Sequence, residues 1–203
     1  MIATPPERLH IDRFDTPVGV AVLATDEGGY LRAFDWSDYE DRQVRLMARY
    51  NGRVPVETGA APAATREALT AYFDGDLHAI ETIPWRSCGT DFQLSCWRAL
   101  CDIPVGSTAS YGEQAARIGK PKAVRAVGLA NGANPIGLVV PCHRVIGANG
   151  TLTGYGGGLD RKRWLLRHEA RRVPRRRAGD LESGVVGAVY AAASPNCRRA
   201  SLA

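Results

Sequence analysis

Short runs rich in Val, Leu, Ile and aromatic residues, with polar residues between them, mark the start of the chain. These runs cover Leu9–Phe14, Val18–Ala24 and Tyr30–Trp36. The sequences D-T-P and D-E-G-G separate them, and both are typical of turns. Apolar runs of this length with turns between them predict an antiparallel β-sheet.

Two helices and one more strand are predicted after this sheet. Ser37 is a candidate N-cap for a helix that continues to Tyr50, where an N-G pair ends it. The segment from Pro62 to Phe73 places its apolar residues on one helical stripe. We expect the apolar run Leu77–Ile83 to return as a strand.

The pattern changes near Trp85–Gly89 and becomes mainly helical, so we place a domain boundary there. Residues 1–85 are expected to form an N-terminal α/β structural domain, and residues 86–170 a mainly helical C-terminal domain. Thr90–Cys101 has its apolar residues at the spacing of an amphipathic helix. Residues 171–203, a basic stretch followed by an Ala/Gly/Ser-rich one, show no sustained period and are expected to be a loosely attached tail.

Two short helices joined by a G-K-P turn are predicted within this second domain. The first contains Ala115, Ala116 and Ile118, and the second covers about Pro121–Ala130. Such a pair indicates a helix-turn-helix, although many similar hairpins only pack. Basic residues on the second helix favour contact with DNA.

Length and residue usage limit the remaining possibilities. The chain has 203 residues, enough for one domain with a substantial core or for two small ones. No run approaches the ~18–20 apolar residues of a membrane helix, and M-I-A-T-P-P-E-R lacks the layout of a secretory signal. We therefore expect a cytoplasmic protein that does not associate with membranes. Five cysteines without a C-x-x-C pair, together with four scattered histidines, argue against a disulfide framework and a metal site.

Positive charge is concentrated towards the C-terminus. The formal net charge is +5, and residues 161–177 carry nine Lys/Arg and one Glu, a local balance of +8 that leaves −3 for the rest. A basic block of this kind is either a solvated tail or the electrostatic footprint of a nucleic-acid site.

A candidate nucleophile and a candidate base stand together at Val139–Gly147, V-V-P-C-H-R-V-I-G. Pro141 should end an apolar strand at Ile136–Val140 and leave Cys142 at an exposed strand end. Cysteine reacts as the thiolate, and a histidine at the next position could accept its proton directly or through a water. Taken alone, a Cys-His pair is weak evidence. Downstream, the glycines of T-G-Y-G-G-G would let a flat ligand approach the backbone, unless they form an ordinary connector.

Residues 89–169 resemble the C-terminal domain of the O6-alkylguanine-DNA alkyltransferases, also called methylated-DNA–protein-cysteine methyltransferases. Seven motifs follow in the family's order: T-x-F-Q-x-x-x-W at Thr90–Trp97, I-P-x-G at Ile103–Gly106, S-Y-G at Ser110–Gly112, K-A-V-R-A-V-G at Lys122–Gly128, A-N-P at Ala133–Pro135, P-C-H-R-V at Pro141–Val145, and G-Y-G-G-G-L…K-x-x-L-L-x-x-E ending at Glu169. The N-terminal part resembles the family only in its hairpin pattern and placement.

The resemblance implies an α+β protein that repairs DNA. Its N-terminal antiparallel sheet with helices would form a ribonuclease H-like roll, and its helical C-terminal domain would contain the helix-turn-helix. The activity implied is irreversible, single-turnover transfer of the alkyl group of O6-alkylguanine in duplex DNA to Cys142, after the damaged base is flipped out. Whether O4-alkylthymine is also accepted is left open. No cofactor or metal is implied, and we expect a monomer.

The resemblance also assigns roles to four further catalytic residues. His143 would be a water-mediated base for Cys142, and Glu169 would orient and charge its imidazole. Tyr111 would donate to guanine N3, and Asn134 would brace the turn that aligns the reactive groups.

The remaining site residues are implied in two groups. The substrate pocket would use the backbone of Val145, Tyr155, Gly156 and Gly157. The protein would bind DNA mainly through its minor groove, and Arg125 would fill the gap left by the flipped base. The residues implied in DNA binding belong to the two short helices: Ser110, Lys122, Arg125, Ala126 and Gly128.

Three other functions fit the sequence less well. The runner-up is a DNA-binding protein that senses alkylguanine without reacting, but such relatives typically carry tryptophan in place of Cys142. A transcription regulator would need a further domain, and a Cys-His hydrolase would leave the DNA-binding motifs unexplained. Gly132 stands where some relatives carry an arginine, which could lower DNA affinity. No role is assigned to Cys197.

Overall fold

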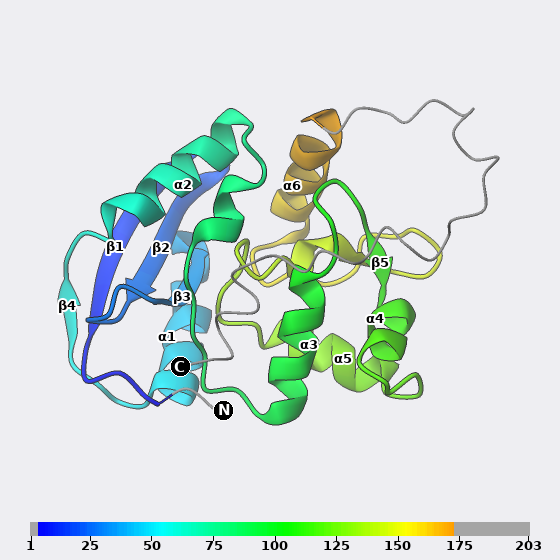
Figure 1. The fold of residues 1–203 in the computed structure, drawn as a ribbon, viewed down its shortest axis with the longest axis horizontal. Helices are drawn as coiled ribbons and strands as arrows, with labels where there is room; N and C mark the ends of the chain where they lie inside the picture. Colours follow the sequence, from blue (N-terminus) through cyan, green and yellow to red (C-terminus); the bar gives the residue numbers. More distant parts are fainter. Residues whose placement is uncertain (1–3, 173–203) are drawn as a thin grey trace.

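The computed structural model describes residues 4–172, which form two halves lying side by side (Figure 1). The sheet half, residues 4–85, contains these elements in order: β1 (Leu9–Thr16), β2 (Gly19–Thr25), β3 (Leu31–Trp36), the 3₁₀ helix η1 (Ser37–Tyr39), α1 (Glu40–Asn51), β4 (Val56–Thr58), α2 (Ala63–Asp74) and the 3₁₀ helix η2 (Ala79–Thr82). The helical half, residues 86–172, contains α3 (Asp91–Cys101), β5 (Ala109–Ser110), α4 (Tyr111–Arg117), α5 (Val124–Gly132), the 3₁₀ helix η3 (Cys142–Arg144), β6 (Val145–Ile146) and α6 (Leu159–Arg172). Residues 173–203, with the predicted tail and Cys197, lie outside the described part.

A four-stranded sheet in the order β3-β2-β1-β4 is the base of the sheet half. The three strands predicted from the sequence are confirmed, and they pair in antiparallel fashion as expected. β4 was not predicted, and it pairs with β1 in parallel, so the sheet is mixed rather than purely antiparallel. All three residues of β4 are exposed, so the strand lacks the alternation that would have revealed it.

The prediction of a strand at Leu77–Ile83 is wrong. This segment forms a turn followed by η2, and its buried residues are Leu77, Ile80 and Ile83. Their spacing of three matches the repeat of a 3₁₀ helix and not the repeat of two that a strand requires. The N-cap prediction at Ser37 is also wrong, because η1 begins there and α1 follows with Tyr39 as its N-cap.

The predicted strand at Ile136–Val140 is a compact turn instead. The amide of Val140 donates to the carbonyl of Ile136, and Leu138 takes a positive φ of 65°. Only Ile136 makes a bridge to the sheet, against Phe34 of β3. The run is apolar because four of its five residues are buried in the core, which a sequence pattern cannot distinguish from a buried strand.

Side-chain caps start two helices of the helical half. Thr90 and Gln93 form a capping box at α3, and Ser110 and Glu113 form another at α4. α5 begins at Val124 rather than near Pro121. A reciprocal amide pair joins α4 to α5, in which Gln114 Nε2 donates to Asn131 Oδ1 (3.0 Å) and Asn131 Nδ2 donates to Gln114 Oε1 (2.7 Å).

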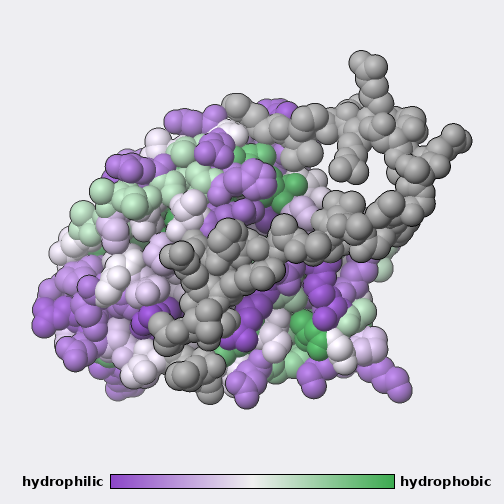
Figure 2. Space-filling model, in the orientation of Figure 1, coloured by the Kyte–Doolittle hydropathy of each residue, from purple (hydrophilic) through white to green (hydrophobic). Residues whose placement is uncertain are grey.

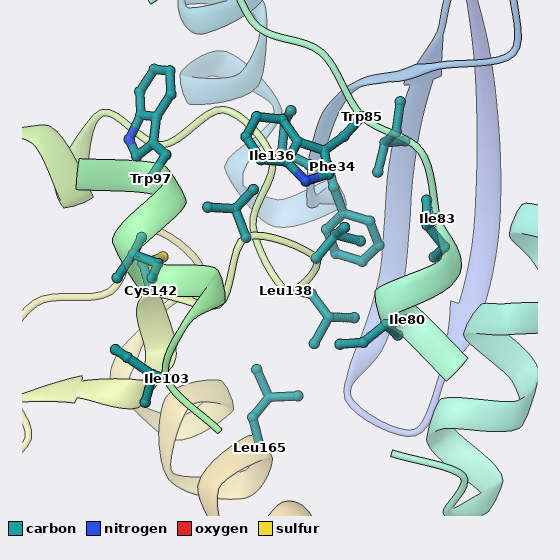
Figure 3. Packing of buried hydrophobic residues seen from close by; sticks show 14 of the residues in the cluster. Phe34, Ile80, Ile83, Trp85, Trp97, Ile103, Ile136, Leu138, Cys142 and Leu165 are labelled. Carbon is teal, nitrogen blue, oxygen red and sulfur yellow. The ribbon is translucent and has the colours of Figure 1, made fainter. Parts of the chain in front are cut away.

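One buried hydrophobic cluster extends through both halves, and part of it is drawn in Figure 3. Where the halves meet, Tyr50 of α1 packs edge-on against Trp97 of α3, and Gln93 of α3 donates to the Tyr50 hydroxyl (2.8 Å). On the face shown in Figure 2, hydrophilic side chains are spread over both halves, with only small hydrophobic patches between them. Among the described residues, no helix has the length and apolar character needed to cross a membrane.

Candidate active site

Cys142 begins η3 and lies in the core, with 8% of its surface exposed. It belongs to the same buried cluster as Trp97, Ile103 and Leu165 (Figure 3). The expectation of an exposed strand end is therefore wrong, because the residues before it turn inside the protein. Access to Cys142 is through a cavity of about 250 Å³, lined by residues from α4, α5, η3 and the glycine loop: Tyr111, Gly128, Asn131, Gly132, Cys142, Gly154, Tyr155 and Gly156.

Asn134 holds the turn that leads into Cys142. Its Nδ2 donates to the carbonyl of Val140 (2.8 Å), and its Oδ1 accepts from the amide of Ile136 (3.0 Å). The amide of Cys142 donates to the same Val140 carbonyl (2.8 Å). These hydrogen bonds join Asn134 to both ends of the turn at Ile136–Val140.

His143 is buried and faces Glu169 of α6. The distance from its Nε2 to Glu169 Oε1 is 3.0 Å, and its Nδ1 has no hydrogen-bond partner among the described residues. A carboxylate next to Nε2 favours the tautomer that carries the proton on Nε2. The lone pair on Nδ1 is then available to accept a proton.

Arg144 and Glu169 form a buried, two-pronged ion pair. Arg144 Nε donates to Oε2 (3.0 Å), and Arg144 Nη2 donates to Oε1 (2.9 Å). Arg144 also donates to the carbonyl of Ile103 (2.8 Å), and the amide of Gly106 donates to Glu169 Oε2 (3.2 Å). Arg144 therefore anchors the carboxylate and does not line the cavity.

Burial and charge set the protonation of these groups. Burial raises the pKa of the Cys142 thiol, against the opposing influence of Asn134 and two nearby cations. Burial also lowers the pKa of His143, although Glu169 opposes this. Burial would raise the pKa of Glu169, but His143 and the permanently charged Arg144 outweigh it and keep that pKa low. The resting site is a neutral thiol, a neutral imidazole and a carboxylate.

Lys162 is a buried cation beneath the cavity that sequence reasoning did not assign to the site. Its ammonium donates to the carbonyls of Val145 (2.6 Å), Thr153 (2.7 Å) and Gly154 (3.1 Å), and burial lowers its pKa to about 8. It is the lysine of the K-x-x-L-L-x-x-E motif, which was the available signal. Val145 was predicted to line the pocket, but it is fully buried, does not line the cavity, and its carbonyl accepts from Lys162.

The glycine loop packs against the sheet half. A Cβ at Gly156 would lie 2.5 Å from the Arg42 guanidinium carbon, and one at Gly157 would lie 2.3 Å from the Trp36 ring. A side chain at Gly157 would therefore collide with the Trp36 ring, and one at Gly156 would displace the Arg42 guanidinium from its ion pair with Asp35. Gly156 lines the cavity with Tyr155, whereas Gly157 lines a separate hollow of about 480 Å³ near the start of α6.

Tyr111 and the residues predicted to touch DNA lie at or near the surface. The Tyr111 hydroxyl donates to the carbonyl of Thr153 (3.2 Å), and a Cβ at Gly128 would contact the Tyr111 ring at 3.8 Å. Ser110 is the N-cap of α4. Three of the predicted DNA-binding residues are exposed on α5 or just before it: Lys122, Arg125 and Ala126.

The structure therefore gathers Tyr111, Gly128, Cys142, Tyr155 and Gly156 around one cavity. His143, Asn134 and Glu169 do not line it: Asn134 holds the turn before Cys142, and His143 faces Glu169. Within residues 4–172, no three His, Cys, Asp or Glu side chains are grouped so that they could hold a metal ion.

Comparison with known families defines the class of protein. Residues 91–171 match the family model described as the DNA-binding domain of 6-O-methylguanine DNA methyltransferase. This segment begins at α3 and ends in α6, so it contains the buried Cys-His-Glu system and its cavity. The site and fold are those of a DNA-binding methyltransferase.

Relatives of similar length place the chain in one family. The methylated-DNA–protein-cysteine methyltransferase of Mycobacterium bovis is 58% identical over 168 residues, which are 82% of this chain and 95% of that protein. The Salmonella typhimurium protein of the same name is 48% identical over 165 residues, or 80% and 96% of the two chains. The chain belongs to the methylated-DNA–protein-cysteine methyltransferases, a family of DNA-repair enzymes.

Solved structures agree with this. The crystal structure of Mycobacterium tuberculosis O6-methylguanine methyltransferase has a TM-score of 0.64 at 42% identity and covers 83% of this chain and 96% of that chain. A structure of the same M. tuberculosis protein in complex with DNA has a TM-score of 0.65 and covers 82% and 96%. The Pyrococcus kodakaraensis enzyme, at 22% identity and a TM-score of 0.57, shares the fold.

Proposed function

We propose that this protein repairs O6-alkylguanine in duplex DNA by moving the alkyl group irreversibly to Cys142. The observation that carries the proposal is the cavity of about 250 Å³ lined by Cys142, whose neighbour in the chain, His143, has a buried Nδ1 without a hydrogen-bond partner among the described residues. Small residues on the other walls leave room for a flat purine, with Tyr111 at one edge and the backbone of Tyr155 and Gly156 at another.

The transfer is a displacement at the alkyl carbon. Cys142 Sγ forms a bond to that carbon while the bond from the carbon to guanine O6 breaks, and guanine leaves with the electron pair. The thiol proton passes through a water to Nδ1 of His143, whose cation Glu169 stabilises. The departing guanine anion takes up one proton from water, and His143 later releases its proton to water, so the protons balance. A hydrogen bond from the Tyr111 hydroxyl to guanine N3 eases the departure. The product is an S-alkylcysteine, so each molecule acts once.

DNA would be held by the helical half. We assign α4 and α5 as a helix-turn-helix, with α5 in the minor groove, where Ala126 and Gly128 permit close approach. Flipping a nucleotide costs a few kcal/mol, and Arg125 would fill the gap in the stack. The known complex of the M. tuberculosis relative with DNA supports this partner. We further assign residues 1–85 as a ribonuclease H-like domain, residues 86–170 as the DNA-binding and transfer domain, and a monomer as the active form.

Intact mass after incubation with a duplex that contains O6-methylguanine tests the proposal. We expect the gain of one methyl group, located on the peptide that holds Cys142, and no second turnover. A Cys142→Ala variant is the control and should gain nothing. Unmodified protein that still binds the damaged duplex would identify the alkylguanine-sensing class instead, and methyl loss from DNA with Cys142→Ala would exclude Cys142 as the acceptor. The same assay with a duplex that contains O4-methylthymine shows whether the protein also accepts that base.

A further inference from the structure

A tyrosine from the sheet half contacts the catalytic carboxylate. The hydroxyl of Tyr72, on α2, donates to Glu169 Oε1 at 3.0 Å, and both side chains are fully buried. Sequence reasoning placed Tyr72 only on the apolar stripe of its helix, and the ring does pack there, edge-on to Phe73. Its hydroxyl has a separate partner, 97 positions further along the chain.

This hydroxyl completes the set of donors around Glu169. Oε1 accepts from Tyr72, from His143 Nε2 and from Arg144 Nη2, while Oε2 accepts from Arg144 Nε and the Gly106 amide. His143 and Tyr72 therefore share one carboxylate oxygen. A donor that draws charge from that oxygen weakens its hold on the neighbouring imidazolium.

We propose that Tyr72 is a positioning residue for alkyl transfer, which orients Glu169 and limits how strongly the carboxylate raises the basicity of His143. This inference rests on the proposed role of His143 as the base. It assigns to the sheet half a direct part in the chemistry of the helical half. The hydrogen bond from Tyr72 thus connects the sheet half directly to the carboxylate of Glu169.

The other charged and titratable groups near Glu169 and His143 have contacts of their own. Arg144 and Lys162 are the cations that face His143, and both are held by partners of their own. Tyr155 meets the His143 ring edge-on at 6.3 Å, and His168 packs beside the Tyr72 ring at 5.2 Å with its Nε2 at the Tyr72 carbonyl.

Burial and the charge of Glu169 raise the pKa of Tyr72 well above its usual value. The hydroxyl therefore keeps its proton throughout the neutral range and acts only as a donor.

Two changes at Tyr72 should act in opposite directions. Tyr72→Phe removes the donor and keeps the ring, so Glu169 binds the His143 cation more strongly and the pKa of His143 rises, by about 0.5–1 unit. Site-specific replacement of Tyr72 by 3-fluorotyrosine makes the phenol more acidic and a stronger donor, so the pKa of His143 falls. Tyr50→Phe is the matched control, because Tyr50 is also a buried tyrosine with a hydrogen-bonded hydroxyl, but its partner is Gln93.

Two measurements report the protonation of His143. One is the pH dependence of the rate of reaction with free O6-benzylguanine, and the other is NMR titration of the imidazole in unreacted protein, assigned by comparison with His143→Gln. We expect the pKa of His143 to rise in Tyr72→Phe, to fall in the fluorinated form and to stay unchanged in Tyr50→Phe. Unchanged titration in both Tyr72 forms, or an equal shift in Tyr50→Phe, overturns it.

The experiments distinguish failure of the Tyr72 proposal from failure of the proposed alkyl transfer. If Tyr72→Phe does not fold, as judged by circular dichroism, the fluorinated form decides alone, since it keeps both ring and hydroxyl. If wild-type protein is never alkylated at Cys142, the proposed function fails, while the NMR titration still measures the influence of Tyr72 on His143.

Discussion

At the scale of single residues, the reactive groups are held in their neutral forms. Burial raises the pKa of the Cys142 thiol and lowers the pKa of the His143 imidazole, so an ion pair between them is disfavoured before substrate arrives. A buried neutral thiol is a poor target for other electrophiles, because the thiolate is the nucleophile. In the proposed transfer, the thiol therefore gives its proton to His143 as it attacks the alkyl carbon.

The pH dependence of alkyl transfer follows from these shifts. His143 can accept a proton only when neutral, and its pKa lies below the ordinary value of 6.5. The rate with O6-benzylguanine should be level above pH 6.5 and should fall as the pH drops through that lowered pKa. Single-turnover rates from pH 5 to 9, with protein integrity checked at each pH, measure this.

A steep rise in rate through the ordinary thiol range would contradict the expectation, since it would show direct reaction of a solvent-generated thiolate without His143.

At the scale of elements, α5 has one face in the core and another exposed to solvent. One face of the helix packs inwards through Val127, Ala130 and Asn131, and its other face exposes Arg125 and Leu129. Gly128 and Gly132 lie between the two faces and line the cavity. A base leaving the duplex at α5 would therefore have only a short path to Cys142.

Arg125→Ala should slow repair in duplex DNA by about 10-fold or more, because the flipped state loses the side chain that fills the stack. Reaction with free O6-benzylguanine should remain unchanged, because Arg125 does not line the cavity. Rates on both substrates measure the difference.

Arg45→Ala, at an exposed position on α1, is the control and should alter neither rate. Equal losses on both substrates for Arg125→Ala would refute a role in flipping.

At the scale of the whole molecule, hydrogen bonds and a common hydrophobic cluster join the two halves. Arg42 of α1 donates to the carbonyls of Gly132 (2.9 Å) and Asn134 (3.1 Å), and the Phe34 amide donates to the carbonyl of Pro135 (2.9 Å). With the buried cluster that runs through both halves, these bonds tie the turn before Cys142 to the sheet.

We therefore expect the described part of the chain to unfold in one cooperative transition. Chemical denaturation followed by far-UV circular dichroism and by exposure of the Cys142 thiol to a thiol reagent should give the same midpoint. The thiol is measured by peptide mapping, with Cys88, which is half-buried, as the internal reference. Separate midpoints would show that the halves unfold independently.

Much of the chain's organisation was readable from its sequence. Apolar runs separated by turn sequences predicted β1, β2 and β3, and all six residues of β3 are buried. The helical spacing of apolar residues predicted α2 and α3. The N-G pair marked the end of α1. The order of the motifs along the chain identified the family. Cys142 and His143 were recognisable as a candidate pair because they are adjacent in the sequence.

Tertiary structure decided what local patterns cannot encode. Ile136–Val140 and Leu77–Ile83 contain buried apolar residues of the core. Only the packed fold shows that the first is a turn and the second a turn followed by a 3₁₀ helix. Tyr72 and Glu169 stand 97 positions apart, so no spacing rule could connect them. The sequence by itself determined which groups could react, because residue type carries the chemistry. Their protonation and their partners depend on burial and long-range contacts, which exist only in the folded chain.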